Sequence, residues 1–109
     1  MVVDETQNET TVILTHSANL VIELATRPGT GYAWQLLEVP QDILRLVNQE
    51  TLTPARTGDR LLGGESKQRF HFKSVSSGQG AVLLGYRRAW EKEADDLKRF
   101  SLQVTVRKH

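Results

Sequence analysis

Apolar and polar residues alternate along most of this chain, so that every second side chain is apolar. The C-terminal stretch RFSLQVTVRK shows this most clearly, because its apolar residues fall on one side and its polar residues on the other. The same period recurs in NLVIEL and RFHF. The apolar positions of the three stretches are Leu20, Ile22, Leu24, Phe70, Phe72, Phe100, Leu102, Val104 and Val106. Such alternation is typical of half-buried antiparallel strands.

Six or seven short strands follow from this pattern and from the turn residues between its segments. The segments are residues 10–15, 18–27, 32–39, 43–52, 67–75, 81–90 and 99–108, of which 43–52 is the weakest. The stretch SSGQG, residues 76–80, predicts a hairpin turn between two strands. The stretch QDILRLV, residues 41–47, fits a short helical turn capped by Asp42.

Strands of this number and spacing predict a single all-β domain that spans residues 1–109. We expect an immunoglobulin-like antiparallel β-sandwich of about seven strands. Trp34 lies on the third strand of this count. By analogy with immunoglobulin-like sandwiches, which often bury a Trp on their third strand, we expect it to lie in the core.

Composition and charge remove several classes of function. The 14 basic and 13 acidic residues nearly cancel, which argues against nucleic acid as a partner. The chain has no Cys, so disulfides and thiol chemistry are excluded. It has no apolar run long enough to span a membrane, and its polar, acidic start does not resemble a signal peptide. We therefore expect a soluble domain without a membrane partner. The compartment stays open, and a periplasmic or secreted location is compatible with removal of a signal.

The residues that could support catalysis or metal binding are scattered. His16, His71 and His109 form neither an HxH nor an HxxxH pattern. Ser66, His71 and Asp59 could be imagined as a triad, but no nucleophile-elbow motif supports them. We therefore predict that the protein is not an enzyme, and that it holds neither a metal nor a cofactor.

The stretch RPGTGYAW, between two predicted strands, has the composition of a loop with a defined shape. Pro28 restricts φ, while Gly29 and Gly31 permit positive φ, so the loop can turn sharply with little remaining freedom. The alternative is an ordinary tight turn with Tyr32 and Trp34 in the core.

Two further loops carry unusual residues. The long connection DRLLGGESKQ contains two leucines and two glycines, Leu61, Leu62, Gly63 and Gly64. One leucine could simply plug the end of the sandwich. The third loop is the stretch YRRAWEKEADD, residues 86–96. At its edge, Arg88 and Trp90 are residue types enriched at binding hot spots. The alternative there is that Trp90 closes the core with Arg88 stacked over it. Gathered at one end of a sandwich, the three loops would form a recognition surface.

The order of these motifs, RPGTGYAW, then RLLGGESKQRFHF, then YRRAW, resembles the chagasin-type inhibitors of papain-like cysteine peptidases. The family pattern is an Asn-Pro-Thr-Thr-Gly-Tyr loop closely followed by Trp, a central Gly-x-Gly-Gly loop preceded by Leu-Leu-Gly, and an Arg-Pro-Trp loop. The chain agrees at Pro28, Thr30, Gly31, Tyr32, Trp34, Leu61, Leu62, Gly63, Arg88 and Trp90. It departs at Arg27, Gly29, Glu65, Ser66 and Ala89. These departures bear on affinity and target preference more than on the class.

The resemblance implies that an immunoglobulin-like sandwich presents the three loops as a wedge to a papain-like cysteine peptidase. Inhibition would be reversible and non-covalent, by occlusion of the active-site cleft and without cleavage of the inhibitor. Thr30 and Gly31 would lie nearest the catalytic Cys, and the other two loops would clamp the flanks. The implied peptidase-binding residues are Pro28, Gly29, Thr30, Gly31, Tyr32, Leu62, Gly63, Gly64, Arg88 and Trp90.

This mechanism needs no metal or cofactor, and a wedge that reaches into a cleft is expected to act as a monomer. The alternative function is an immunoglobulin-like adhesion or carbohydrate-binding module. In that case Trp90 and Tyr32 would stack on sugars or on a receptor.

Overall fold

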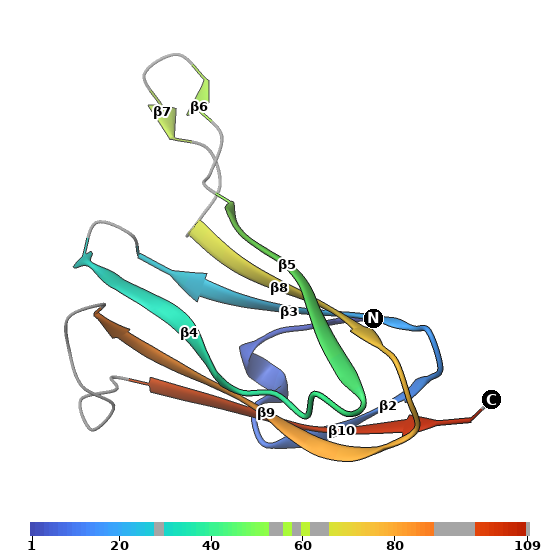
Figure 1. Cartoon of the computed structure of the whole chain (residues 1–109). Coiled ribbons are helices and arrows are strands. Elements are labelled where there is room, and N and C mark those ends of the chain that lie inside the picture. Colours follow the sequence, from blue (N-terminus) through green and yellow to red (C-terminus); the bar gives the residue numbers. More distant parts are fainter. Residues whose placement is uncertain (28–29, 53–55, 58–59, 62–65, 89–97, 109) are drawn as a thin grey trace.

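Two four-stranded β-sheets packed face to face form the body of the computed structural model (Figure 1). The structure describes residues 1–27, 30–52, 56–57, 60–61, 66–88 and 98–108. The first sheet consists, in spatial order, of β1 (Val2–Val3), β3 (Asn19–Thr26), β8 (Ser66–Ser74) and β5 (Leu44–Leu52). The second consists of β2 (Thr10–Thr15), β10 (Lys98–Arg107), β9 (Gly78–Arg88) and β4 (Tyr32–Glu38). A short 3₁₀ helix, η1 (Glu5–Gln7), and a two-stranded ladder, β6 (Arg56–Thr57) with β7 (Arg60–Leu61), complete the described elements.

The hydrophobic core lies between the two sheets, as the alternation predicts. In β3 the alternate residues Leu20, Ile22 and Leu24 are fully buried, and the same holds for Phe70 in β8 and Leu102 in β10. These three strands thus contribute one apolar face each to the core, and burying apolar surface is the main favourable term in folding. The prediction of an all-β sandwich is confirmed, with eight strands in the two sheets of the described chain rather than about seven.

The sheets are mixed, so the expectation of a wholly antiparallel sandwich needs correction. The strand β1 pairs with β3 in parallel, and β2 pairs with β10 in parallel. The remaining pairs in the two sheets are antiparallel. Alternation indicates which side of a strand is buried, but it carries no information on the direction of the neighbouring strand.

The predicted hairpin at residues 76–80 is wrong, because this stretch passes from one sheet to the other. The strand β8 ends at Ser74 in the first sheet, and β9 begins at Gly78 in the second. The crossing requires glycine: Gly78 has a φ of +149°, and a Cβ at Gly80 would lie 2.4 Å from the Cβ of Pro40. A turn signal marks a change of direction, but does not show whether the next strand pairs with the previous one.

The proposed helical turn at residues 41–47 is shorter than predicted. The N–H groups of Ile43 and Leu44 both donate to the Pro40 carbonyl oxygen, at 3.0 and 2.9 Å, which makes a single turn. The chain is extended from Leu44 onward, where β5 pairs with β8. The pairing with β8 therefore overrides the local helical spacing.

The register of the strands brings the ends that flank all three special loops to the same end of the sandwich. Thr26 lies opposite Ser66 and Leu52 opposite Lys67 in the first sheet, while Tyr32 lies opposite Arg88 in the second. We call this the loop end, formed by Thr26, Tyr32, Leu52, Ser66, Arg88 and Lys98. In Figure 1 it lies on the left, with β6 and β7 beyond the ends of β5 and β8.

The opposite end, which we call the turn end, consists of residues 15–18, 40–44 and 74–80. Within the described ranges, no helix has both the length and the apolar character needed to cross a membrane.

Candidate functional site

The structure places four of the predicted site residues together at the loop end. Thr30, Gly31 and Tyr32 form the turn into β4, and Arg88 ends β9 directly opposite Tyr32. The other six predicted residues lie outside the described part of the chain, namely Pro28, Gly29, Leu62, Gly63, Gly64 and Trp90. The site is therefore described from its first loop and from the strand ends that support all three loops.

The described part of the first loop is closed by hydrogen bonds centred on Thr30. Its N–H and its hydroxyl both donate to the Arg27 carbonyl oxygen, at 3.0 and 2.7 Å. The same hydroxyl accepts the N–H of Tyr32 at 3.3 Å. Gly31 has a φ of +82°, in the left-handed region that favours glycine, which confirms the role predicted for it. The turn is thus fixed by its own residues.

A row of three aromatic rings, from Tyr32, Tyr86 and Trp34, lies between the first loop and the core. The rings of Tyr32 and Tyr86 stack with their centroids 5.4 Å apart, and Trp34 packs against Tyr86 with a centroid distance of 5.0 Å. Trp34 and Tyr86 are buried, as expected for Trp34, whereas Tyr32 is half-buried at the top of the row. Aromatic pairs at such distances contribute about 0.5–1.5 kcal/mol beyond their burial. The row links the loop rigidly to the core.

Two cations lie on these rings. The Arg88 guanidinium carbon is 4.6 Å from the Tyr32 ring centroid, and Arg88 Nε donates to the Thr30 carbonyl oxygen at 3.3 Å. Lys98 Nζ lies 5.9 Å from the centroid of Tyr86. Arg88 therefore joins the strand that leads into the third loop to the first loop. Trp90, over which the sequence alternative places Arg88, lies outside the described residues.

The stem of the first loop, residues 25–27, is held by side chains from other strands. Tyr86 accepts the Arg27 N–H on its hydroxyl at 2.9 Å, and Trp34 Nε1 donates to the Ala25 carbonyl oxygen at 2.9 Å. The Thr26 hydroxyl lies 3.4 Å from that of Tyr86. Tyr86 was not among the predicted site residues, because its position beside Trp34 follows from the pairing of β4 with β9.

A second residue that the sequence analysis missed is Gln68, near the start of β8. Its Oε1 accepts the Trp34 N–H at 2.7 Å, and its Nε2 donates to the Trp34 carbonyl oxygen at 3.2 Å. One amide thus binds both main-chain groups of Trp34, as a neighbouring strand would. Because β8 and β4 belong to different sheets, this contact ties the strand after the second loop to the strand after the first.

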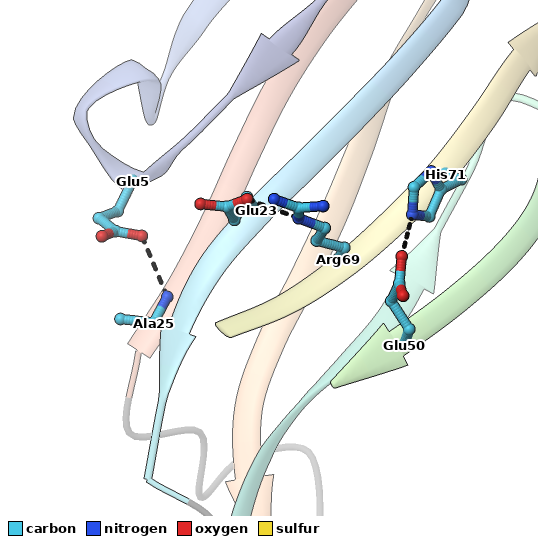
Figure 2. Close-up of polar contacts among 6 residues, drawn as sticks. All are labelled: Glu5, Glu23, Ala25, Glu50, Arg69 and His71. Carbon is cyan, nitrogen blue, oxygen red and sulfur yellow. Dashed lines mark hydrogen bonds and ion pairs between the residues drawn. The ribbon is translucent and has the colours of Figure 1, made fainter. Parts of the chain in front are cut away.

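The loop end contains a shallow cavity of about 390 Å³. Its lining consists of Ala25, Thr26, Arg27, Thr30, Tyr32, Tyr86, Arg88 and Lys98. No three His, Asp or Glu side chains of the described residues gather where they could hold a metal ion. His71 instead pairs with Glu50, at 2.7 Å between Nε2 and Oε2 (Figure 2). The described geometry is that of a surface cavity beside a loop held by aromatic rings and hydrogen bonds.

Comparison with known proteins agrees with this geometry. The family model described as "Chagasin family peptidase inhibitor I42" matches residues 14–104. Amoebiasin-2 from Entamoeba histolytica is 29% identical over 106 residues, covering 97% of this chain and 85% of the relative. Chagasin from Trypanosoma cruzi is 28% identical, covering 94% of each chain.

The fold has a close counterpart among solved structures. The crystal structure of the cysteine protease inhibitor EhICP2 from Entamoeba histolytica aligns with a TM-score of 0.84 and 27% identity, covering 97% of this chain and 94% of that one. The family match favours the inhibitor hypothesis over the adhesion or carbohydrate-binding alternative, and confirms that the protein is not an enzyme. The chain belongs to the chagasin family of peptidase inhibitors.

Proposed function

We propose that this protein is a reversible, non-covalent inhibitor of papain-like cysteine peptidases, and that its loop end occludes the active-site cleft. The observation that supports this most directly is the strand register, which brings the ends flanking the three motif-bearing loops to one end of the sandwich. The structurally similar EhICP2 is itself a cysteine protease inhibitor.

The described part of the first loop is suited to this role because it is preorganised. Its turn is closed by the Thr30 bonds and rests on the ring of Tyr32, so little conformational entropy remains to be lost on docking. Gly31 has no side chain to obstruct a close approach of the backbone to the cleft. We place Thr30 and Gly31 nearest the catalytic Cys of the peptidase, beside Pro28 and Gly29.

The other two loops supply the flanks in this proposal. Leu62, Gly63 and Gly64 contact one side of the cleft, and Arg88 with Trp90 contacts the other. Protease–inhibitor complexes bury about 800 Å² on each partner, which one loop of this size cannot supply but three can. Trp90 is the proposed anchor, since a large rigid ring yields much contact area for few frozen torsions.

The proposal assigns no covalent step to the inhibitor. The Thr30 hydroxyl is already engaged as a donor to Arg27 and as an acceptor from Tyr32, and Gly31 offers no reactive group. Occlusion requires only shape and complementary contacts. We further propose that residues 1–109 act as a single, monomeric inhibitor domain that binds one peptidase.

Titration of papain with the protein tests the function. We expect activity on a peptide substrate to fall in proportion to added inhibitor, reaching zero near a 1:1 ratio, with a 1:1 complex in light scattering. Trypsin serves as the control and should keep its activity. Unchanged activity of several papain-like peptidases at micromolar inhibitor would overturn the proposal.

A second measurement tests the non-covalent part alone. Papain whose catalytic Cys is replaced by Ala should bind the protein with an affinity close to that of active papain. The inhibitor released from a complex with active papain should have its original mass. A strict requirement for the thiol, or a cleaved inhibitor, would contradict occlusion while leaving inhibition itself established.

A further inference from the structure

The N-terminal segment reaches the stem of the first loop along the outer edge of β3. Val21 donates its N–H to the Met1 carbonyl oxygen at 2.9 Å, so β1 covers this edge as far as the pair of Val3 with Ile22. Alternate residues of a strand direct their N–H groups to the same edge. The N–H of Ala25 therefore lies on the edge that β1 covers, but beyond the end of β1.

Beyond the end of β1, the side chain of Glu5 binds the same edge of β3. Its Oε2 accepts the Ala25 N–H at 3.2 Å, as Figure 2 shows at the left of the view. A carboxylate thus replaces the carbonyl group that a longer β1 would have supplied. Hydrogen bonds to an ionised acceptor are stronger than those between neutral groups.

The position of Glu5 is itself fixed by the capping box of η1. Asp4 Oδ1 accepts the Thr6 N–H at 2.9 Å, and Gln7 Oε1 accepts the Asp4 N–H at 2.9 Å. The first residue of this short helix is Glu5, whose carbonyl oxygen accepts the Asn8 N–H at 3.2 Å. The backbone that carries the carboxylate is therefore held at both ends.

We call η1 and the bond from the Ala25 N–H to Glu5 the N-terminal brace. Ala25 links this brace to the candidate site. Its N–H is bound by Glu5 from η1, and its carbonyl oxygen is bound by Trp34 Nε1 from β4. Two residues later the Arg27 N–H is bound by the Tyr86 hydroxyl, and the Arg27 carbonyl oxygen accepts both bonds from Thr30. A shift of Ala25 is thus transmitted through a three-residue stem to the turn at Thr30.

We propose that Glu5 is a positioning residue for inhibition. Through the Ala25 amide it fixes the stem of the first loop, and it thereby increases affinity for the peptidase without contacting it. This inference rests on the proposed function, because the affinity in question is that of the loop end for a papain-like peptidase.

The same sheet provides a matched control in Glu23. Glu23 lies on β3 two residues before Ala25, and its Oε2 is 2.6 Å from Arg69 Nε (Figure 2). Its partner is a side chain on the neighbouring strand, not a backbone group of the stem. Glu5→Ala and Glu23→Ala remove the same charge, but only the first removes a bond to the stem.

Inhibition constants and dissociation rates with papain give the first readout. Glu5→Ala should raise the inhibition constant about three- to tenfold, mainly through faster dissociation, as expected for one lost hydrogen bond to a charged group. Glu5→Gln keeps an acceptor oxygen and should stay within about twofold of the wild type, as should Glu23→Ala. Equal effects of Glu5→Ala and Glu23→Ala, or no rescue by Gln, would overturn the proposal.

Amide hydrogen exchange of the free protein gives the second readout and needs no peptidase. In Glu5→Ala the amides of Ala25 and Arg27 should exchange faster, while those of Leu102 and Val104 in the core keep their protection. Unchanged exchange at Ala25 would show that Glu5 does not fix the stem, even if the protein inhibits. A wild-type protein that inhibits no papain-like peptidase would instead refute the proposed function and the claimed gain in affinity, with the exchange result still deciding whether Glu5 holds the stem.

Discussion

The two ends of the sandwich differ in how far they depend on hydrogen bonds from side chains. At the loop end, main-chain groups of residues 25–27 and of Trp34 are bound by side chains, from Glu5, Tyr86 and Gln68. At the turn end, four bonds join main chain to main chain, and the side chains of Ser74 and His16 bind further main-chain groups. Ile43 and Leu44 donate to Pro40, Val75 donates to Ile43, and Ser74 donates to Ala18.

Because of this difference, we expect substitutions at the two ends to have different consequences. Bonds between main-chain groups survive most substitutions, so the turn end depends on fewer side chains, chiefly Ser74, and on the close approach of Gly78 and Gly80 to their neighbours. The loop end depends on the identity of several side chains, and these set where the first loop lies. We therefore expect changes at the turn end to alter stability alone, and changes at the loop end to alter inhibition.

The largest effect on stability is expected for Gly80→Ala at the turn end. The added Cβ would lie 2.4 Å from Cβ of the rigid Pro40 ring, which forces backbone movement. We expect a loss of about 3 kcal/mol in the free energy of unfolding, measured by urea denaturation. The neighbouring exposed position provides the control, and Gln79→Ala should change stability by less than about 0.5 kcal/mol. If folded Gly80→Ala protein inhibited papain more weakly than the wild type, the claim that changes at the turn end alter stability alone would be wrong.

The largest effect on inhibition is expected for Trp90→Ala, a position outside the described residues. Loss of an interface anchor costs about 2 kcal/mol or more, which is at least about a thirtyfold rise in the inhibition constant for papain. Trp90→Phe retains an aromatic ring and should lose less. A folded Trp90→Ala variant with unchanged inhibition would remove the third loop from the binding surface.

Ser74→Ala tests a hydroxyl at the turn end. Ser74 Oγ accepts the Ala18 N–H at 2.8 Å and donates to the Thr15 carbonyl oxygen at 2.7 Å. Removing both bonds from this buried position should lower the free energy of unfolding by about 1–2 kcal/mol. The inhibition constant should stay within the error of the assay, and a clear rise would show that the turn end influences the loops.

Tyr86→Phe is the corresponding hydroxyl deletion at the loop end. It leaves the ring row intact but removes the acceptor of the Arg27 N–H. We expect a loss of about 1 kcal/mol in stability and, in contrast to Ser74→Ala, a rise of about threefold or more in the inhibition constant. Equal inhibition by the two hydroxyl deletions would contradict the comparison.

The smallest effect concerns the acid sensitivity of the N-terminal brace. Hydrogen bonds from the Thr6 hydroxyl and from its N–H hold the pKa of the Asp4 carboxyl below its ordinary value of 3.8. Because the folded pKa is the lower one, the cap stabilises the fold fully above the ordinary value and is lost as the pH falls through the folded pKa. Carbon-detected NMR titration of Asp4 should give a midpoint below 3.8, with Thr6 amide protection lost over the same range. A midpoint at or above 3.8 would refute the capping role.

Much of the fold could be predicted from the chain because several of its strands bury one apolar face. Leu20, Ile22 and Leu24 illustrate this, since their spacing alone places them in the core. The partners of the strands could not be predicted in the same way. The pattern of residues 76–80 is the same whether the next strand pairs with β8 or crosses to the other sheet, and alternation in β2 does not show its parallel direction.

The candidate site, too, could be predicted from the sequence only in part. The motifs indicated Thr30, Gly31, Tyr32 and Arg88, and the described structure brings these four together. Tyr86, Gln68 and Glu5 were missed because each acts on main-chain atoms far away in the sequence. The bond between Tyr86 and Arg27, for example, spans 59 positions, and it depends on the register of two sheets rather than on any local pattern.

The Gln68 amide has a consequence for the behaviour of the protein in solution. Within the described strands, β4 is the edge of its sheet and leads directly from the first loop. Exposed edge strands recruit strands from other molecules and so promote aggregation. By binding both main-chain groups of Trp34, Gln68 prevents another chain from forming strand hydrogen bonds with this residue. We therefore expect Gln68 to hinder pairing of β4, beside the first loop, with the same strand of a second copy of the protein.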